Sequence, residues 1–265
     1  MNLGARAPGI SSAVVIEPAG TGNAPGARDV FRTGPLWSAE ASRESSEAMR
    51  VFVVGITGAV GGLLARKLAA HGDDVTGLVR RPEQQHPLQD LGIRTVIGDL
   101  ATLTVDELAE AFTGQDVIVY SAGSNGGSRD VTAAVDGEGV ERAAEAALLA
   151  DVRRFVLVSV YPESWRERDL DDDVEYYFAV KKRADVSLTR TGLDWVILRP
   201  SLLTDEPGHG SVSMGPAELH DQISRDDVAA TLTEIVHEPR IRRQILEINT
   251  GATAIPEAVL NNIRS

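Results

Sequence analysis

The chain has 265 residues, 43% of them hydrophobic and 25% charged, which is typical of a globular protein with a sizeable core. Its formal net charge of −13 disfavours nucleic acids and anionic membrane surfaces as partners, because both require a basic face. Cysteine is absent and no apolar run approaches the ~18–20 residues of a membrane span, so we expect no disulfides, no thiolate chemistry and no transmembrane helix.

The first 48 residues differ in composition from the rest of the chain. They are rich in Gly, Ala, Pro, Ser and Arg and show no sustained hydrophobic periodicity. Such a segment buries too little apolar surface to offset its ordering entropy, so residues 1–48 are predicted to be a disordered extension of a folded domain over residues 49–265. The segment lacks the pattern of a secretory signal, and its acidic residues argue against a transit peptide. Met49 directly precedes the first predicted strand and is a candidate start of the native chain, which mass spectrometry of the native N-terminus tests.

From Met49 onward, strand-like and helix-like patterns alternate regularly. Strands are predicted over residues 51–54, 74–79, 94–97, 116–120, 154–160, 194–200 and 244–248. A first helix is predicted to end near residue 72, and further helices to span residues 84–91, 104–112, 131–150, 174–191, 224–237 and 255–263. Repeated βα units with nearly continuous apolar strands indicate an α/β fold, a doubly wound parallel Rossmann sheet with helices on both faces.

The last third of the chain is predicted to add a small C-terminal substrate lobe to the same sheet. Residues 161–173 and 204–220 contain Gly, Pro and acidic residues and are predicted to be loops that form a mobile lid over the substrate. In a doubly wound sheet the ligand lies beyond the carboxyl ends of the strands, so the residues that follow each strand are the candidate site.

The glycine-rich stretch after the first predicted strand is the first candidate ligand site. It reads Gly55-Ile56-Thr57-Gly58-Ala59-Val60-Gly61, between a strand and a helix, which is the context that a dinucleotide-binding fingerprint requires. Gly55 permits a tight turn, Gly58 permits close approach of a pyrophosphate, and Gly61 permits close packing of the helix on the sheet. We expect Thr57, Ala59 and Val60 to contact the cofactor as well. The alternative is a turn between strand and helix that binds no ligand.

Two arginines at the end of the second predicted strand bear on the choice of cofactor. Arg80 and Arg81 stand where NAD-binding proteins usually place an acidic residue for the ribose 2′-hydroxyl, whereas an arginine pairs with the 2′-phosphate of NADP. The expected cofactor is therefore NADP(H). The alternative is a pair of solvated arginines before a proline.

Two further strand ends are candidate cofactor contacts. Asp99 and Leu100 follow the third predicted strand and are expected near the adenine, although an Asp at a strand end is also ordinary loop chemistry. Ser121, Ala122 and Gly123 follow the fourth predicted strand, where small side chains leave room for the nicotinamide ribose.

A YxxxK spacing on a predicted helix is the candidate catalytic element. Tyr177 and Lys181 share one face of the helix, so the ammonium is expected to lie near the phenol and lower its pKa. Such a phenol can exchange a proton with a carbonyl or alcohol, and Ser159 at the end of the fifth predicted strand can donate a second hydrogen bond to the same oxygen. The alternative is a tyrosine in the core, and Tyr176 beside it raises the chance of an accidental match.

Taken together, these motifs resemble those of the short-chain dehydrogenase/reductase superfamily, in its atypical branch of NmrA-like and NAD-dependent epimerase/dehydratase-like proteins. The resemblance covers residues 49–265 and includes Val79-Arg80, Gly98-Asp99-Leu100, the Tyr177–Lys181 spacing, the stretch 195–200 and the stretch 223–229. It implies a Rossmann fold, NADP binding in which Lys181 takes part, and Ser159, Tyr177 and Lys181 as catalytic residues.

The chain departs from this superfamily at one position. The superfamily's fourth active-site residue, an Asn on the long helix before the fifth strand, has no clear counterpart, and Asp136 stands at about that place. An Asp can still hold a water near Lys181, but it adds a negative charge. Asp136 is therefore the fourth candidate catalytic residue.

The predicted function is hydride transfer between NADP(H) and a small carbonyl or alcohol substrate, as in oxidoreductases and epimerase-like enzymes. Two alternatives remain open: an NADP(H)-sensing regulator of the NmrA type that does not turn over, and a flavin or quinone reductase that needs no tyrosine. The protein is expected to be a cytoplasmic monomer or homodimer. No metal site is predicted, because none of the five histidines (His71, His86, His209, His220 and His237) stands at i, i+4 to another.

Overall fold

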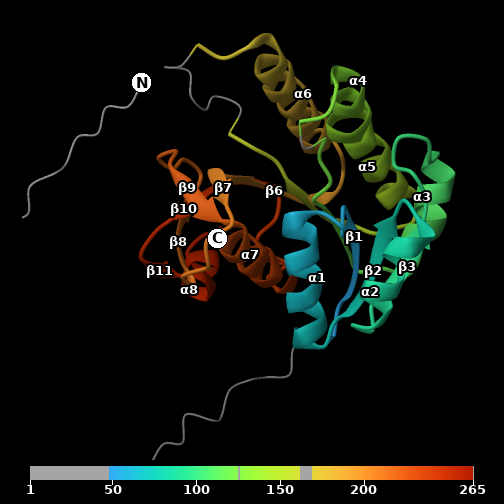
Figure 1. Ribbon diagram of the computed structural model, residues 1–265. Coiled ribbons are helices and arrows are strands. Elements are labelled where there is room, and N and C mark those ends of the chain that lie inside the picture. The colour runs from blue at the N-terminus through green and yellow to red at the C-terminus, as the bar shows by residue number, and fades with distance from the viewer. Residues whose placement is uncertain (1–47, 125, 162–168, 265) are drawn as a thin grey trace, which may run out of the picture. The chain divides into compact units, whose positions relative to one another are not determined.

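The computed structural model describes residues 48–124, 126–161 and 169–264. Its main element is a nine-stranded sheet, mostly parallel (Figure 1). In spatial order its strands are β11 (Thr253–Ala254), β8 (Ser211–Gly215), β10 (Gln244–Thr250), β6 (Asp194–Pro200), β5 (Arg154–Val158), β4 (Val117–Tyr120), β1 (Arg50–Val54), β2 (Asp74–Val79) and β3 (Arg94–Ile97). Seven strands from β10 to β3 run parallel, whereas at the far edge β8 pairs antiparallel with β10 and β11 pairs antiparallel with β8. This is the Rossmann-type α/β fold that the sequence predicts.

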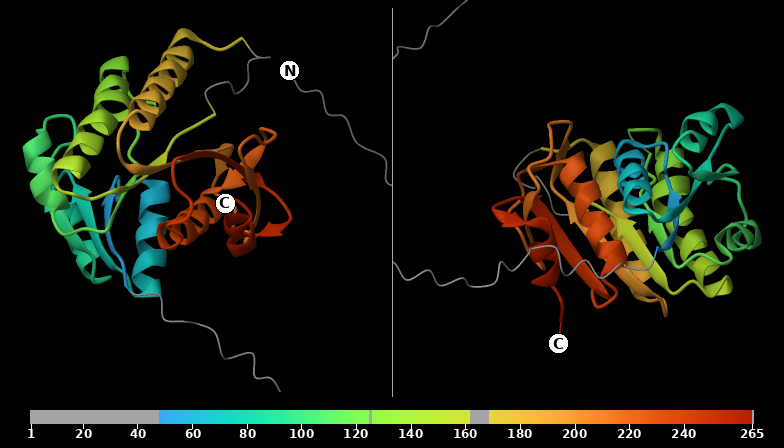
Figure 2. Two further views of the ribbon diagram at one scale, coloured as in Figure 1. Left: turned by 180° about the vertical axis from the view of Figure 1, so that it is seen from behind. Right: turned by 90° about the horizontal axis from the view of Figure 1, so that it is seen from below.

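Helices cover both faces of the sheet. They are α1 (Ala59–His71), α2 (His86–Gln89), α3 (Val105–Phe112), α4 (Arg129–Thr132), α5 (Gly139–Leu149), α6 (Asp172–Thr189), α7 (Arg225–His237) and α8 (Ile255–Leu260), with a 3₁₀ turn η1 (Pro82–Gln84) and a π-helical segment η2 (Ala133–Glu138). α1, α7 and α8 share one hydrophobic core, and α3, α5 and α6 share the other. Figure 2 shows α1 and α7 side by side on the first face.

The alternation of side chains along the strands produces these two cores. In β1, Val51 and Val53 belong to the core under α1 and α7, while Phe52 and Val54 belong to the core under α3, α5 and α6. All four side chains are fully buried, which explains why the strand reads as a continuous apolar run rather than as an alternating one. Both layers of helices are therefore anchored on the same few strands.

The strand order reverses direction between β1 and β4, which are hydrogen-bonded neighbours. The chain moves outward from β1 to β2 and β3, and then returns to β4 on the other side of β1. The connecting loops therefore separate at this point, and their separation leaves a crevice beyond the carboxyl ends of β1 and β4.

The structure corrects two of the predicted elements. The helix expected over residues 131–150 is three segments, α4, η2 and α5, because a π-helical turn interrupts it. The loop expected over residues 204–220 contains β8, whose backbone pairs antiparallel with the edge of β10. Its sequence, Ser-Val-Ser-Met-Gly, carries little strand signal, so the free edge of β10 decides its conformation.

Smaller differences concern the ends of elements and the C-terminal part of the chain. β5 ends at Val158 rather than at residue 160, and α6 begins at Asp172 because Asp171 caps it. The C-terminal part also contains a two-stranded parallel sheet of β7 (Leu202–Thr204) and β9 (Gln222–Ser224). The expected disordered extension and much of the first expected lid loop fall on residues 1–47 and 162–168, outside the described residues, whereas the second expected lid loop, residues 204–220, is described and contains β8. No helix in the described part of the chain is both long and apolar enough to cross a bilayer.

Candidate functional site

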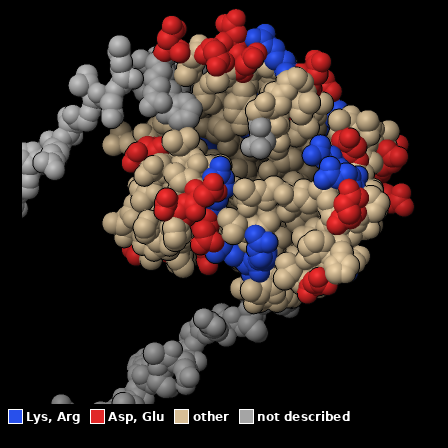
Figure 3. All heavy atoms as spheres, viewed as in Figure 1, with Lys and Arg blue, Asp and Glu red and all other residues tan. Residues whose placement is uncertain are grey.

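A cleft of about 840 Å³ lies at the carboxyl ends of the central strands. Figure 3 shows that this face of the molecule is hollowed near its centre, with basic side chains beside the hollow. Fifteen of the seventeen site residues predicted from the sequence line the cleft: Gly55, Thr57, Gly58, Ala59, Val60, Arg80, Asp99, Leu100, Ser121, Ala122, Gly123, Asp136, Ser159, Tyr177 and Lys181. The two others, Gly61 and Arg81, do not line it.

The N-terminus of α1 opens onto this cleft and carries no protein anion. Its N-cap is Gly58, which has no side chain to accept a hydrogen bond, and its first turn contains no acidic residue. By contrast, α3, α6 and α7 each have a capping side chain and acidic residues in the first turn. The unpaired N–H groups and the positive end of the dipole of α1 are thus available to an anionic ligand such as a pyrophosphate.

Gly55 and Gly61 hold α1 close to the loop that follows β4. Gly55 has a φ of +92°, and a Cβ there would lie 2.5 Å from the backbone nitrogen of Ala122. A Cβ on Gly61 would lie 2.2 Å from the carbonyl oxygen of Gly55 and 2.7 Å from Ser121 Oγ. Gly61 thus acts beneath the cleft, in the helix packing that its place in the motif predicts, and this explains why it does not line the cavity.

The two arginines after β2 have different surroundings. Both are exposed, and the backbone N–H groups of both donate to Gln84 Oε1 at 3.0 Å. Arg80 lines the cleft, whereas the guanidinium of Arg81 forms an ion pair with Glu83 at 2.9 Å. Arg80, and not Arg81, is therefore the arginine of this pair that the structure places at the cleft.

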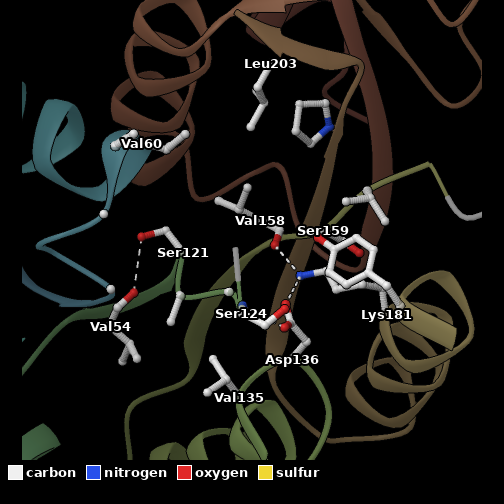
Figure 4. A pocket seen from close by; sticks show the side chains of 18 of the residues that line it. Val54, Val60, Ser121, Ser124, Val135, Asp136, Val158, Ser159, Lys181 and Leu203 are labelled. Carbon is white, nitrogen blue, oxygen red and sulfur yellow. Dashed lines mark hydrogen bonds and ion pairs between the residues drawn. The ribbon is translucent and has the colours of Figure 1, made fainter. Parts of the chain in front are cut away.

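The strand ends at β3 and β4 form the next part of the wall. Asp99 is exposed and its carboxylate accepts from the backbone N–H of Ala101 at 3.0 Å, which is an ordinary turn contact, while Leu100 is buried beside it. Ser121 Oγ donates to the carbonyl oxygen of Val54 at 3.2 Å and so ties the end of β4 to the end of β1. Figure 4 shows this bond. The small residues that follow leave the centre of the cleft open.

Lys181 and Asp136 form a buried ion pair at the inner wall of the cleft. Lys181 Nζ lies 3.5 Å from Asp136 Oδ1 and donates to the carbonyl oxygen of Val158 at 3.1 Å (Figure 4). The other oxygen of Asp136 accepts from the backbone N–H of Ser124 at 2.8 Å. Asp136 thus connects the loop after β4 to α6, and it lies in the π-helical segment η2. π-helical turns of this kind occur frequently at functional sites.

Tyr120 stabilises this π-helical turn from beneath. Its hydroxyl donates to the carbonyl oxygen of Val135, and Gly139 leaves room for it, since a Cβ on Gly139 would lie 2.5 Å from that hydroxyl. Burial raises the pKa of Tyr120 well above its usual value, so the phenol stays protonated as a donor. The sequence does not show this contact, because Tyr120 reads only as the last residue of a buried strand.

The ionisation of the site follows from these contacts. Burial lowers the pKa of the Lys181 ammonium, but the nearby Tyr177 and Asp136 raise it, and its net direction is upward. Burial raises the pKa of Tyr177, and Lys181 only partly offsets this effect. The sequence correctly predicts the influence of Lys181 on Tyr177, but the expectation of a lowered pKa is wrong, because burial is the larger effect.

The outer part of the cleft contains polar residues that the sequence prediction missed. Tyr161 and Ser201 line it together with His220. Ser201 Oγ lies 3.4 Å from His220 Nδ1, and the rings of Tyr161 and His220 are in contact, with centroids 5.1 Å apart. Ser201 directly follows β6 and Tyr161 is the third residue after β5, so a search of the residues that follow each strand would have found both. No local pattern marks His220.

The comparisons with known proteins agree with this geometry. A family model described as NAD(P)H-binding matches residues 55–239, which include the glycine turn, Arg80 and the Tyr177–Lys181 pair. The chain belongs to this NAD(P)H-binding family. The resemblance to NAD(P)-binding, epimerase/dehydratase-like proteins that the motifs indicate is thereby confirmed.

Several relatives of this NAD(P)H-binding chain carry descriptions of enzymes. YhfK from Bacillus subtilis, described as an uncharacterized sugar epimerase, is 34% identical over 80% of this chain and 99% of its own length. A proposed NAD-dependent epimerase/dehydratase from Bacillus halodurans is 29% identical, with a TM-score of 0.74 over 81% of this chain and all of that one. The oxidoreductase YlbE from Lactococcus lactis is 30% identical, with a TM-score of 0.72 over 82% of this chain and 99% of that one. The family is thus oxidoreductase- and epimerase-like.

Proposed function

We propose that this protein is an NADP(H)-dependent oxidoreductase or epimerase-like enzyme that transfers hydride between the cofactor and a small carbonyl or alcohol substrate. The observation that carries the proposal is the convergence of Ser159, Tyr177 and Lys181 on one cleft with the uncapped N-terminus of α1. The first three residues supply proton chemistry and the helix terminus supplies a nucleotide site. A protein that only binds the nucleotide needs the second feature alone.

The residues of the cleft fit a dinucleotide. The N–H groups of α1 would hold the pyrophosphate, the guanidinium of Arg80 would pair with a 2′-phosphate, and the small residues 121–123 would accommodate the nicotinamide ribose. Leu78 and Leu100 supply apolar wall next to Asp99, where an adenine would lie. When bound, the cofactor supplies or accepts the hydride.

The chain's own residues would hold and move the proton. The ion pair with Asp136 and the bond to Val158 hold the Lys181 ammonium near the phenol of Tyr177. The raised pKa of Tyr177 keeps the phenol protonated at neutral pH, which suits donation of a proton to a carbonyl oxygen that gains a hydride. Ser159, directly after β5, would donate a second hydrogen bond to the same oxygen.

The part of the cleft beyond these residues would hold the substrate. Its wall combines apolar side chains, among them Phe178 and Leu203, with the polar group of Tyr161, Ser201 and His220. Such a surface suits a small molecule with an apolar part and one or more hydroxyl or carbonyl groups. The cytoplasmic location and the monomeric or homodimeric state expected from the sequence remain predictions.

Replacement of Tyr177 by Phe tests the proposal. We expect Tyr177→Phe to bind NADPH normally but to lose about 10²–10⁴-fold in kcat for carbonyl reduction, because the ring remains while the proton donor is lost. Oxidation of NADPH is measured against panels of carbonyls, quinones and flavins. Tyr176→Phe is the matched control, because Tyr176 stands next to Tyr177 but does not line the cleft, and it contacts Arg129 instead.

The other results would each identify an alternative. Binding of NADPH without oxidation by any compound of the panel would favour an NADP(H) sensor. Reduction of quinones or flavins that is unchanged in Tyr177→Phe would favour a reductase that needs no proton donor. An equal loss of kcat in Tyr177→Phe and Tyr176→Phe would contradict a specific role for Tyr177.

A further inference from the structure

A second group of polar side chains lies at the end of α1 away from the cleft. His71 is the last residue of α1, His237 is the last residue of α7, and Asp73 lies between them just before β2. His237 Nε2 is 3.0 Å from Asp73 Oδ1, and His71 Nδ1 is 3.4 Å from Asp73 Oδ2. One ligand atom from each residue lies within 4.8 Å of the other two. His237 is 164 residues from Asp73 in the chain, so no local spacing marks the group.

The hydrogen bonds of His237 determine its tautomer. They indicate that the nitrogen that faces Asp73 is itself a hydrogen-bond acceptor. Nδ1 lies 2.8 Å from the carbonyl oxygen of Thr233, and this contact requires a proton on Nδ1. In a neutral imidazole, Nε2 then carries a lone pair, and this lone pair faces the carboxylate of Asp73. Two acceptors in this position need a cation between them. A histidine that donates its second nitrogen to a backbone carbonyl is also the usual arrangement of a histidine that binds a metal ion.

Asp73 is the buried centre of the group. Its side chain is fully buried, and Oδ1 also accepts from the backbone N–H of Met49 at 3.0 Å. Oδ2 accepts no hydrogen bond from the described residues, although a buried carboxylate oxygen normally has a donor. The carboxylate therefore has an unused acceptor directed toward His71.

The two helices add to the attraction for a cation. Both α1 and α7 end at this group, so the negative ends of two helix dipoles and one carboxylate meet at the same point. The side chain of His71 is 41% exposed, which provides a path for an ion from solvent. His237 is 14% exposed, and Asp73 is closed to solvent.

We propose that His71, Asp73 and His237 bind a divalent transition-metal ion, with zinc as the best fit. Two imidazole nitrogens and one carboxylate oxygen are ligands that zinc prefers, and a solvent molecule would complete a tetrahedral site. Ligand atoms of a tetrahedral zinc site lie roughly 3.3 Å apart when each is about 2.0–2.1 Å from the ion. His237 Nε2 lies 3.0 Å from Asp73 Oδ1 and His71 Nδ1 lies 3.4 Å from Asp73 Oδ2, so each imidazole is at about this spacing from one of the two carboxylate oxygens.

Such an ion would crosslink α1 and α7, the two helices that flank the cleft. α1 begins at the glycine turn and α7 begins at Arg225, which also lines the cleft, so both helices run from the cleft to the metal site. Zinc would link their far ends to each other and, through Asp73, to the start of β2. The proposed role is structural, and the site contributes no group to the chemistry in the cleft.

Direct titration of the untagged chain with ZnCl₂ and CoCl₂ tests the site, at a pH above the ordinary histidine pKa of about 6.5. We expect one Zn²⁺ per chain by calorimetry, a rise in Tm with zinc, and a visible absorption band of tetrahedral Co²⁺. His71→Gln and Asp73→Asn should each weaken binding at least tenfold, as a rough lower bound. His71→Gln changes an exposed side chain, so the fold should survive.

His86→Gln is the matched control. His86 also faces a carboxylate, with Nδ1 3.3 Å from Asp90 Oδ2, but that pair is exposed and has no third ligand within the described residues. Its zinc affinity should equal that of the natural chain. The absence of zinc binding, or equal affinity in His71→Gln and His86→Gln, would overturn the proposal.

Discussion

At the scale of single residues, the Asp136–Lys181 pair shows how one side chain organises several parts of the cleft. A buried ion pair is costly unless its remaining polar atoms find partners. Here the ammonium also donates to Val158 and the carboxylate also accepts from the backbone of Ser124. The pair therefore joins β5, α6, η2 and the loop after β4 at one point. The negative charge that Asp136 adds, compared with an Asn, is balanced by Lys181 and helps to keep this lysine protonated.

Arg80 provides a prediction at the same scale. Arg80→Ala should weaken NADPH binding about 10–100-fold and leave NADH binding nearly unchanged, because the loss of a charged hydrogen bond to the 2′-phosphate costs about 1.5–3 kcal/mol. Dissociation constants for both cofactors by fluorescence titration measure the effect. Arg81→Ala is the control, since the guanidinium of Arg81 already pairs with Glu83. An equal preference for NADPH in Arg80→Ala and in the natural protein would refute the assignment.

At the scale of secondary-structure elements, α1 is distinguished by the way it begins. α3 begins with a capping box in which Thr104 and Glu107 satisfy each other's backbone N–H groups, and α7 begins with Ser224, whose hydroxyl accepts from the backbone N–H of Asp227. α1 has no such cap and starts with a glycine. α1 begins at the switch point of the sheet and has no anion of its own there. This is the arrangement that a nucleotide-binding element requires.

The packing of α1 gives a prediction for two adjacent glycines. Gly61→Ala should lower the free energy of unfolding by about 1–3 kcal/mol and weaken NADPH binding, because its Cβ would overlap the carbonyl oxygen of Gly55 and push α1 away from the turn. Urea denaturation and cofactor titration measure both effects.

Gly62→Ala is the matched control in the same helix. A Cβ at Gly62 would lie 3.3 Å from the carbonyl oxygen of Ile56, a close contact that a shift of a few tenths of an ångström relieves, so the substitution should change the free energy of unfolding by at most about 0.5–1 kcal/mol. Equal stability of the two alanine variants would contradict the inference that close packing requires a glycine at position 61.

At the scale of the whole molecule, the buried ionisable groups connect the cleft to overall stability. Burial raises the pKa of Tyr120, Tyr161 and Tyr177, and the surroundings of Lys181 raise its pKa as well. Each of these groups binds its proton more tightly in the folded than in the unfolded state. Their contribution to stability is therefore present below the ordinary values of 10.0 and 10.5 and is lost as the pH rises above them. Burial lowers the pKa of Arg154 to about 10, which acts in the opposite direction in the same range.

We accordingly expect the free energy of unfolding to fall as the pH rises above about 10, the ordinary pKa of tyrosine. Tyr177→Phe removes one of the four raised groups, so its stability should fall less steeply in the same range. Urea denaturation at a series of alkaline pH values measures both slopes. A free energy of unfolding that stays constant or increases across this range would contradict the assigned directions of the pKa shifts. An identical slope against pH in Tyr177→Phe would contradict the raised pKa of Tyr177.

The sequence by itself determined the fold class and most of the cleft wall. In a parallel sheet the carboxyl ends of the strands meet at one edge, so local patterns at the ends of β1, β2, β4 and β5 place Gly58, Arg80, Ser121 and Ser159 together without knowledge of any long-range contact. The Tyr177–Lys181 pair is likewise local, because four residues are about one turn of a helix. Periodicity and spacing carry this information, and neither depends on the rest of the fold.

Only the tertiary structure decided the rest, because contacts between distant segments leave no local pattern. The phenol of Tyr120 and the close fit at Gly139 accompany the π-helical turn that carries Asp136. Residues 211–215 form a strand because they pair with the free edge of β10. The pKa of Tyr177 is raised because the tertiary structure buries its phenol. The meeting of the ends of α1 and α7 placed His71 and His237 around one carboxylate, in a chain whose histidine spacing predicts no such group.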